Sequence, residues 1–258
     1  HDGWFAGTIH RAPWERTPRR PLLDDVWELY DVRADFSLVN DLAAAKPEKL
    51  KELQARFLEE AARNHVLPID DRVFERMIAS QVDRPDLMAG RTSLTLGEGM
   101  TGMLENVFLN VKNRSVTITA DVEVPEGGGN GAILVQGGRF GGWALYVKDG
   151  VPGYHYNFLG LQQTGVVGTQ ALAAGAHTIR MDFVYEGKGP GQGGTVTLSV
   201  DGAKVAEGKL PHTQAAIFSA DETADVGIDL GTPVVEAVGS EAASRFTGRI
   251  PKVVVEVK

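Results

Sequence analysis

The sequence predicts a mainly β protein that begins with a small α+β part. Residues 139–149 and 195–200 alternate apolar and polar side chains with a period of two, which is typical of strands with one face on a core. Residues 47–64 instead repeat their apolar side chains at helical spacing. These patterns favour one helix near the start and a sheet-rich remainder.

Composition excludes several classes of function. The 258 residues are enough for one large or two medium domains. The net charge of −8, with no basic stripe, argues against nucleic acid as a partner. No apolar run is long enough to span a bilayer, so no membrane contact is expected. The absence of cysteine excludes disulfides, thiolate metal sites and a cysteine nucleophile.

The chain begins with His1 and lacks the charged and apolar segments of a signal peptide. We therefore expect a fragment or a processed piece of a longer protein. The compartment stays open between a bacterial cytoplasm and periplasm, with the chain expected to be soluble.

The first 35 residues predict two short strands, at 4–9 and 26–30, joined by a proline-rich loop. The loop carries a basic cluster on an acidic protein, made of Arg11, Arg16, Arg19 and Arg20. Such a cluster is either a solvated loop or a surface for an acidic partner or anionic substrate.

A helix is predicted over residues 47–64, because Pro47 suits the first helical position and Glu48 the first turn. Val66-Leu67-Pro68 should end it. Residues 70–90, with apolar positions such as Val73 and Ile78, predict a short helix and an irregular connector.

The remainder predicts a β-sandwich, because many short strands are separated by regular turn signals. Asp201-Gly202 is a strong hairpin signal between two of them. The predicted strands cover residues 115–124, 131–137, 142–148, 153–158, 162–167, 175–185, 195–200, 204–209 and 252–258.

The beginning of the chain resembles the C-terminal subdomain of the sulfatase family. The resemblance rests on His1-Asp2-Gly3-Trp4, on Trp27-Glu28-Leu29-Tyr30-Asp31, on Asn40-Asp41-Leu42-Ala43 and on the helix that follows. Residues 110–125 and 136–150 are similar to an extra β domain found in large bacterial arylsulfatases of that family. The resemblance implies two domains, a sulfatase C-terminal subdomain at 1–90 and a β-sandwich at 91–258.

The second domain also resembles the concanavalin A-like, or laminin G-like, jelly rolls. Gly175-Ala176-His177-Thr178-Ile179 is similar to the motif that opens one core strand there, and Val200-Asp201-Gly202 to the motif that closes another. The resemblance implies short antiparallel strands and one long helix followed by a jelly-roll β-sandwich.

The sulfatase resemblance implies chemistry that this chain does not carry. In the family, a formylglycine made in a C/S-x-P-S-R motif is the nucleophile and a Ca²⁺ orients the sulfate. The sequence contains neither a cysteine nor that motif. We therefore expect no catalytic residue and no cofactor in this chain, with formylglycine and Ca²⁺ in a separate N-terminal catalytic half. That half is the expected partner, and an exposed subdomain face would also permit self-association.

Four residues are candidates to approach a substrate of that catalytic half: His1, Trp4, His10 and Trp14. The resemblance implies that the loop after the first strand can reach the mouth of the active site, where imidazole and indole groups suit an aryl sulfate. The alternative role is packing between the two halves of a sulfatase fold.

The acidic segment 219–233 offers weak candidates for Ca²⁺, namely Asp221, Asp225 and Asp229. Their spacing fits no EF-hand, so an ordinary loop is the favoured interpretation and no metal is expected. Aromatic residues of the sandwich could stack on sugar, although alternation places about half of them in the core.

Two functional hypotheses therefore remain. The chain is either the C-terminal part of an arylsulfatase, which completes the catalytic fold and adds an accessory sandwich, or a glycan-binding, lectin-like module. An exposed apolar face on residues 1–70, including some of Trp4, Phe5, Trp27, Leu29 and Phe57, would favour the first hypothesis.

Overall fold

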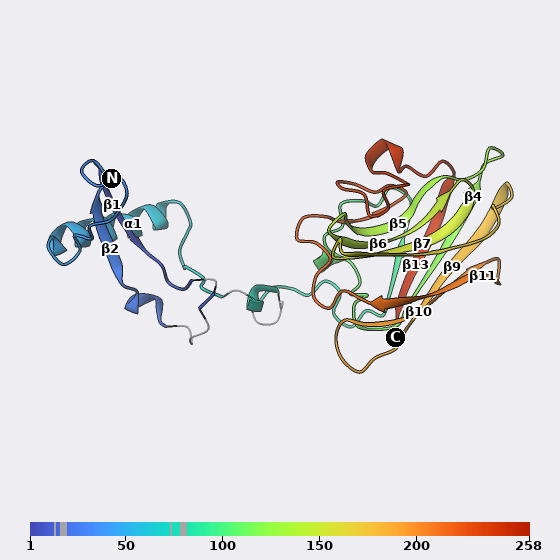
Figure 1. The fold of residues 1–258 in the computed structure, drawn as a ribbon, viewed down its shortest axis with the longest axis horizontal. Helices are drawn as coiled ribbons and strands as arrows, with labels where there is room; N and C mark the ends of the chain where they lie inside the picture. Colours follow the sequence, from blue (N-terminus) through green and yellow to red (C-terminus); the bar gives the residue numbers. More distant parts are fainter. Residues whose placement is uncertain (13, 16–19, 73, 78–81) are drawn as a thin grey trace. The chain divides into compact units, whose positions relative to one another are not determined.

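The protein is described by a computed structural model that covers residues 1–12, 14–15, 20–72, 74–77 and 82–258. Its contacts divide the chain into unit 1, His1–Arg84, and unit 2, Pro85–Lys258. The division (Figure 1) falls a few residues before the boundary predicted at residue 90. Arg16 and Arg19 of the basic cluster, and Val73 and Ile78 of the expected short helix, lie outside the described residues.

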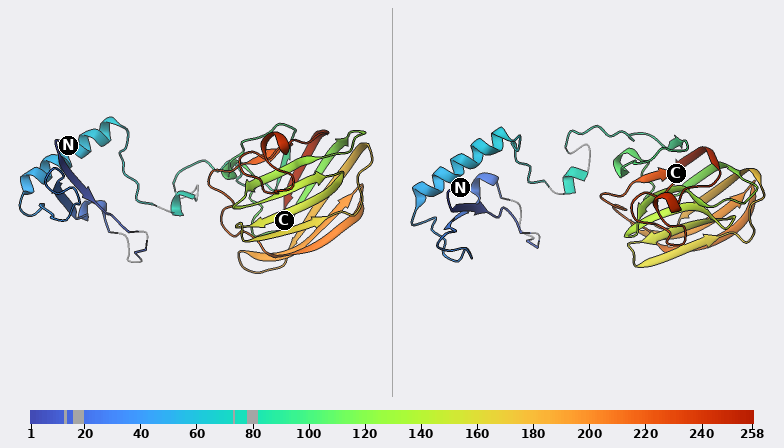
Figure 2. Two further views of the ribbon diagram at one scale, coloured as in Figure 1. Left: turned by 45° about the horizontal axis from the view of Figure 1, so that its top comes forward. Right: turned by 90° about the horizontal axis from the view of Figure 1, so that it is seen from above.

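Unit 1 is a β-hairpin packed against one helix (Figures 1 and 2). Strands β1 (Trp4–Thr8) and β2 (Trp27–Asp31) pair antiparallel, and a single-turn helix, η1 (Leu22–Asp24), lies in the connection between them. The helix α1 (Pro47–Arg63) packs on them through the edge of the Trp27 ring against Phe57, with 5.7 Å between ring centroids. Further along, the described part of residues 70–90 contains the short helix η2 (Phe74–Met77).

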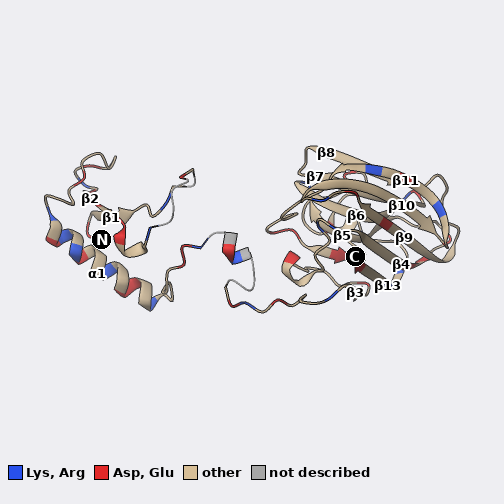
Figure 3. Cartoon of the chain, turned by 90° about the horizontal axis from the view of Figure 1, so that it is seen from below, with Lys and Arg blue, Asp and Glu red and all other residues tan. Residues whose placement is uncertain are grey.

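The observed helix α1 agrees with the predicted one to within a residue. Pro47 occupies its first turn, where a missing N–H costs no hydrogen bond, and Glu48 faces the positive end of the helix dipole. Acidic and basic residues are interspersed along the helix (Figure 3), and some of them form three-residue-spaced ion pairs such as Glu48–Lys51 on its exposed side. The solvent face of the helix is therefore charged, as its pattern predicts.

Two aspartates between β2 and α1, Asp35 and Asp41, have structural roles. Asp35 Oδ2 accepts hydrogen bonds from the backbone N–H groups of Val39 and Asn40, which closes the turn after β2. Asp41 Oδ1 accepts from the N–H groups of Leu29 and Ala43, and the bond from Leu29 is the main reason why the pKa of Asp41 is lowered. These bonds thus tie the strand to the segment that leads into α1.

Unit 2 is an antiparallel β-sandwich (Figures 1 and 2), and this level of the prediction is confirmed. One sheet has the strand order β11-β10-β9-β4-β13-β3 and the other β12-β5-β6-β7-β8. This arrangement is consistent with a jelly roll. The bounds are β3 (Ser93–Leu96), β4 (Val116–Val124), β5 (Gly131–Gly138), β6 (Gly141–Lys148), β7 (Val151–Phe158), β8 (Gln162–Val167), β9 (Gly175–Tyr185), β10 (Gln192–Val200), β11 (Ala203–His212), β12 (Ala224–Val226) and β13 (Arg249–Val257).

The core of unit 2 lies between its two sheets. Trp143 and Leu145 of β6 face Ile118 of β4 and Leu198 of β10, and all four are buried. The alternation that predicts β6 and β10 is therefore the alternation between core and outer face. A smaller cluster covers the outer side of the five-stranded sheet, where Tyr146 packs with residues of the segment 234–238.

Two edge strands, β3 and β12, are absent from the sequence prediction. Each is short, and its hydrogen-bonding partner is far away in sequence: β3 pairs with β13, and β12 pairs with β5. Local patterning carries little information about strands of three or four residues that are held by distant partners. Both lie at an edge of their sheet.

The two jelly-roll-like motifs meet in the folded chain. Asp201 and Gly202 adopt positive φ angles of 50° and 82°, as a tight hairpin turn requires, and the predicted hairpin between β10 and β11 is confirmed. The carboxylate of Asp201 contacts His177 Nδ1 at 2.7 Å and accepts the N–H of Thr178. These contacts pin the turn to the start of β9.

Among the described residues, no helix is long and apolar enough to cross a membrane.

Candidate functional site

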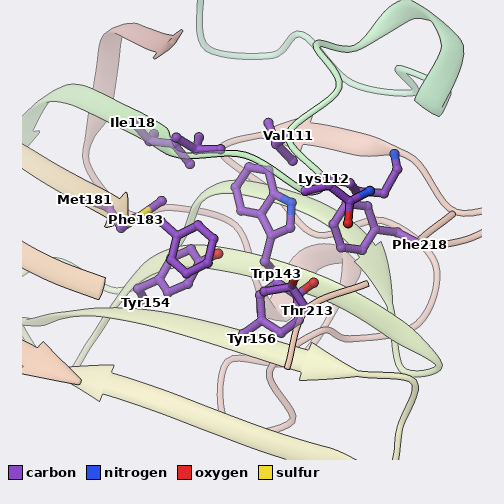
Figure 4. A pocket seen from close by; sticks show the side chains of 12 residues that line it. Val111, Lys112, Ile118, Trp143, Tyr154, Tyr156, Met181, Phe183, Thr213 and Phe218 are labelled. Atoms are coloured by element: carbon purple, nitrogen blue, oxygen red, sulfur yellow. The ribbon is translucent and has the colours of Figure 1, made fainter. Parts of the chain in front are cut away.

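The core encloses a small cavity between the sheets, of about 20 Å³ (Figure 4). Trp143, Tyr154 and Tyr156 line it from one sheet and Met181 from the other. Because a water molecule needs at least ~10–15 Å³ of such space, the cavity holds about one water and no sugar ring. Burial raises the pKa of Tyr154 well above its ordinary value, as expected in an apolar interior.

These aromatic residues therefore belong to the core and offer no platform for sugar. Trp143, Tyr154 and Tyr156 are all at most 5% exposed, and Tyr146 is buried under the smaller outer cluster. Only Phe158 among the aromatics considered from the sequence is partly exposed. The sequence-based suggestion of stacking along these strands is not supported.

A larger cleft, which we call the edge cleft, lies at the border of the sandwich and measures about 670 Å³. Three segments line it: residues 98–101 after β3, residues 226–230 at the end of β12, and residues 245–249, which lead into β13. Its floor is apolar, with Val226, Ile228 and Phe246 buried. The volume lies in the range of ~300–1,000 Å³ that is typical of sites for small ligands, and the exposed surface of the cleft is somewhat more polar than apolar.

The first wall of the edge cleft is fixed to β12. The N–H of Val226 donates to the carbonyl of Met100 at 2.9 Å, and the N–H of Gly102 donates to Asp225 Oδ1 at 2.7 Å. Glu98 Oε2 accepts the N–H of Ile250 at 3.0 Å, which orients the Glu98 carboxylate. This loop is therefore held at both of its ends.

The opposite wall depends on a close approach of two backbones. Gly131 has a φ of 114°, and a Cβ built on it would lie 2.5 Å from the carbonyl oxygen of Arg245. Only glycine permits this contact. The N–H of Phe246 also donates to the carbonyl of Gly227. Residues 245–246 are thus locked onto both β5 and the end of β12.

A buried carboxyl group supports the same wall from behind. Asp229 is 2% exposed; its Oδ2 accepts the N–H of Val234 and its own N–H donates to Ser244 Oγ. Burial, together with the charges of Asp225, Glu222 and Glu241, raises the pKa of Asp229 to about 7. Asp229 Oδ1 has no hydrogen-bond partner within the described residues.

The three weak Ca²⁺ candidates do not form a common site. Asp225 and Asp229 bond backbone N–H groups on different segments, whereas Asp221 is exposed and bonds Ser219. Among the residues that the structure describes, no group of three or more His, Asp or Glu side chains is placed to hold a metal ion.

The rim of the edge cleft is polar and carries more positive than negative charge. Arg245, Arg249, Glu98 and Thr101 are all exposed at its border. Within the described part of the chain, neither arginine has an ion-pair partner, although the protein as a whole carries a net charge of −8. The cleft therefore presents two available guanidinium groups, a carboxylate and a hydroxyl around an apolar floor.

The four residues expected near a substrate all lie in unit 1. His1 is exposed and pairs with Asp2, and Trp14 is 82% exposed. Trp4 is half-buried, with the ammonium groups of Lys46 and Lys49 within 6 Å of its ring centre. The structure does not bring these three side chains into one cavity.

His10 is the one member of that set in a polar cluster. Its Nδ1 lies 2.8 Å from Asp25 Oδ1, and its Nε2 lies 3.3 Å from Asp71 Oδ2. Arg20 also bonds Asp25 and donates to the carbonyl of His10. The cluster fastens the loop between β1 and β2 to the segment after α1. Whether any of the four contacts a substrate stays a prediction.

The sequence interpretation missed Glu98, Arg245 and Arg249, because three distant segments assemble the edge cleft. Some signal was present, since Gly97, Gly99 and Gly102 cluster beside one wall. Glycine clusters mark turns without indicating which other segments those turns meet.

Comparison with known proteins yields only distant structural likenesses. No protein-family model matches the chain, and no curated protein sequence matches it. The CBM40 domain of the Ruminococcus gnavus IT-sialidase, solved with alpha2,6 sialyllactose, has 16% identity and a TM-score of 0.43 over 64% of this chain and 90% of that one.

Two further solved structures are similar at the same level. Mouse laminin alpha1 domains LG4-5 have 15% identity and a TM-score of 0.39, over 66% of this chain and 40% of theirs. A botulinum neurotoxin type C structure, whose title describes interaction with two ganglioside molecules, has 11% identity and a TM-score of 0.42 over 64% and 39%. Likenesses this distant assign neither a ligand nor an activity to the chain.

Proposed function

We propose that unit 2 is a carbohydrate-binding module that holds its ligand in the edge cleft. The single observation that carries the proposal is the combination found there: a cleft of about 670 Å³ with an apolar floor, and guanidinium, carboxylate and hydroxyl groups on its rim. A sugar ring offers the matching chemistry, with apolar C–H faces and hydroxyl groups that both donate and accept hydrogen bonds.

The cleft is also prepared for binding before a ligand arrives. Both walls are held by backbone hydrogen bonds, and Glu98 is oriented by the N–H of Ile250. A preformed site loses less conformational freedom on binding than a flexible loop would. The small aromatic-lined cavity in the core is closed to any such ligand by its size.

Isothermal titration of the full chain with a panel of oligosaccharides tests this proposal. Thr101→Trp should fill the edge cleft and abolish binding, because Thr101 is exposed on its rim. Thr95→Trp is the matched control, since Thr95 is exposed on the neighbouring strand β3 and does not line the cleft. Binding that survives Thr101→Trp, or that Thr95→Trp abolishes equally, would refute the assignment.

We also propose that unit 1 serves as the C-terminal subdomain of a sulfatase and binds the catalytic part of that enzyme. The observation that favours this is the exposure of large apolar side chains on so small a unit. Phe5 on β1 is 45% exposed, and Phe36 and Val39 after β2 are 89% and 74% exposed. A two-stranded sheet with one helix gains little stability by itself and profits from a partner surface.

In this proposal unit 2 is the accessory domain of the same enzyme. Formylglycine and Ca²⁺ would come from the catalytic part, and unit 1 would complete its fold. The exposed apolar side chains would then become buried in the joint core.

Co-expression of the chain with a sulfatase catalytic part tests the second proposal. Copurification and hydrolysis of 4-nitrophenyl sulfate should both depend on Phe36, so Phe36→Ser should weaken both. Lys51→Ser, on the charged face of α1, is the control and should change neither. Copurification that Phe36→Ser does not weaken, or a failure of the two parts to copurify at all, would contradict the proposal.

A further inference from the structure

We infer that the edge cleft selects carbohydrates that carry an anionic oxygen group, a sulfate ester or a carboxylate, through Arg245 and Arg249. The inference rests on the proposed carbohydrate binding and names the ligand class of that same site. Nothing in the sequence prediction or in the distant structural likenesses points to these two arginines.

The chemistry of the two side chains is the first argument. A guanidinium group is permanently cationic and offers a planar fork of N–H donors that matches the paired oxygens of a carboxylate or a sulfate. Arg245 and Arg249 both line the edge cleft, and within the described residues neither forms an ion pair, although Glu123 lies opposite Arg249 in the pairing of β13 with β4. Elsewhere in unit 2, Arg139 and Arg180 are paired with Glu236 and Asp182.

The local charge balance is the second argument. The chain as a whole carries a net charge of −8, which would repel an anionic ligand from most of its surface. The edge cleft, however, is lined by two arginines and a single glutamate, Glu98. The residues that line the rim therefore carry a net positive charge, although the protein as a whole is acidic.

Two acidic groups behind the cleft are engaged in contacts within the fold. Both carboxylate oxygens of Asp225 accept hydrogen bonds, from the N–H of Gly102 and the hydroxyl of Thr223. Asp229, behind the wall, is largely protonated below about pH 7 because burial raises its pKa to that value. Within the described residues, neither carboxyl group forms an ion pair with Arg245 or Arg249.

Contacts of the main chain fix the backbone positions of Arg245 and Arg249, from which the two guanidinium groups extend. The close contact between Gly131 and the carbonyl of Arg245 sets one position, and Arg249 begins β13, which pairs with β4 at Glu123. Glu98, bonded to the next residue of β13, Ile250, is then available for the sugar hydroxyls. An anionic sugar would meet cationic and acceptor groups on one rim.

The test is isothermal titration of the full chain with two matched pairs of oligosaccharides. The first pair is a κ-carrageenan oligosaccharide and its desulfated form, and the second is an oligogalacturonide and its methyl ester. Inorganic sulfate is titrated alongside. The charged member of at least one pair should bind at least about tenfold more tightly than its neutral partner, as expected for charge-assisted hydrogen bonds. The pair that shows the difference identifies sulfate or carboxylate as the recognised group.

Variants locate the effect. Arg245→Gln and Arg249→Gln should each reduce the preference for the charged member by about tenfold, leaving the affinity for the neutral member little changed. Arg114→Gln, an exposed arginine outside the cleft, is the control for the loss of one positive charge and should leave the preference intact. Thermal melting of each variant verifies that the fold is retained.

The outcomes separate the two proposals. Equal binding of charged and neutral members, unaffected by either cleft variant, would overturn the inference while the carbohydrate-binding proposal stands. Binding of inorganic sulfate without binding of any sugar, or no binding at all, would overturn the carbohydrate-binding proposal and the inference with it.

Discussion

The two units of this chain differ in how much apolar surface they bury. Within the described residues, unit 1 has four buried hydrophobic residues: Leu29, Tyr30, Leu53 and Ala61. Unit 2 builds a continuous core between two sheets and a second cluster on the outside of one of them. Unit 2 is therefore stabilised by a much larger core of its own than unit 1 is.

The difference also explains how the units position their polar groups. In unit 2, rigid strands hold the loops of the edge cleft, and buried aspartates fasten those loops to the sheet. In unit 1, side-chain contacts such as that between His10 and Asp25 hold the long loop onto the hairpin. Because the core of unit 1 is small, polar contacts have a larger part in positioning its loop. Such contacts each contribute less to stability when they are partly exposed.

The largest expected effect is a difference in unfolding free energy between tryptophan substitutions in the two units. Trp143→Ala in unit 2 should cost about 3–5 kcal/mol of unfolding free energy, because the ring is 2% exposed and packs between Phe108 and Tyr154. Trp14→Ala in unit 1, where the ring is 82% exposed, should change stability by less than about 0.5 kcal/mol. Chemical denaturation measures both, and a loss below about 1 kcal/mol for Trp143→Ala would contradict the described core.

The next effect concerns pH and the buried carboxyl of unit 2. The pKa of Asp229 is about 7 in the fold, against 3.8 as its ordinary value, so the folded state binds more protons between these values. Stability should therefore fall as pH rises from about 4 to about 7, by up to about 4 kcal/mol from this group. Asp229→Asn should remove most of that decline in pH-dependent melting; an unaltered profile would show that the carboxyl is ionised without penalty.

A smaller loss is expected for the aromatic contact of unit 1. Trp27 is only partly buried, with its ring edge against Phe57, so Trp27→Ala should cost about 1–2 kcal/mol of local stability. Limited proteolysis of the segment Pro47–Arg63 should accelerate accordingly, while unit 2 should stay resistant. Equal acceleration in unit 2 would mean that the units do not unfold independently.

The smallest effect involves the pair that pins the β10–β11 turn. The hydrogen bond to Asp201 raises the pKa of His177, so its stabilising contribution is complete below about pH 6.5 and is lost as pH rises through the higher folded value. Because Asp201 is half exposed, we expect less than about 1 kcal/mol in total. His177→Gln should flatten the melting profile above about pH 6.5, a change that nuclear magnetic resonance titration of His177 in the parent protein would corroborate.

The sequence predicts most of this fold, because most of its strands and its helix α1 have recognisable patterns within their own residues. Strands such as β6 and β10 combine alternation with turn residues, and α1 combines helical spacing with Pro47. The short edge strands β3 and β12 do not, because their strand conformation depends on pairing with residues far along the chain.

The edge cleft could not be predicted from local patterns either, because segments far apart in the sequence form it. Arg245 and Arg249 look like isolated surface charges in the sequence, and only the fold brings them to the same cleft as Glu98. The acidic segment offered only weak metal candidates and was interpreted as an ordinary loop, and its Asp225 and Asp229 hold backbone N–H groups. The sulfatase resemblance of unit 1 remains a prediction carried by its motifs.

Hydrogen exchange of the full chain, with and without the tightest-binding oligosaccharide, tests the central claim that unit 2 binds carbohydrate in the edge cleft. We expect exchange to slow on binding in residues 97–102, 226–230 and 245–249, with no change in His1–Arg84. Slowing confined to other loops of the sandwich, or to unit 1, would contradict the account.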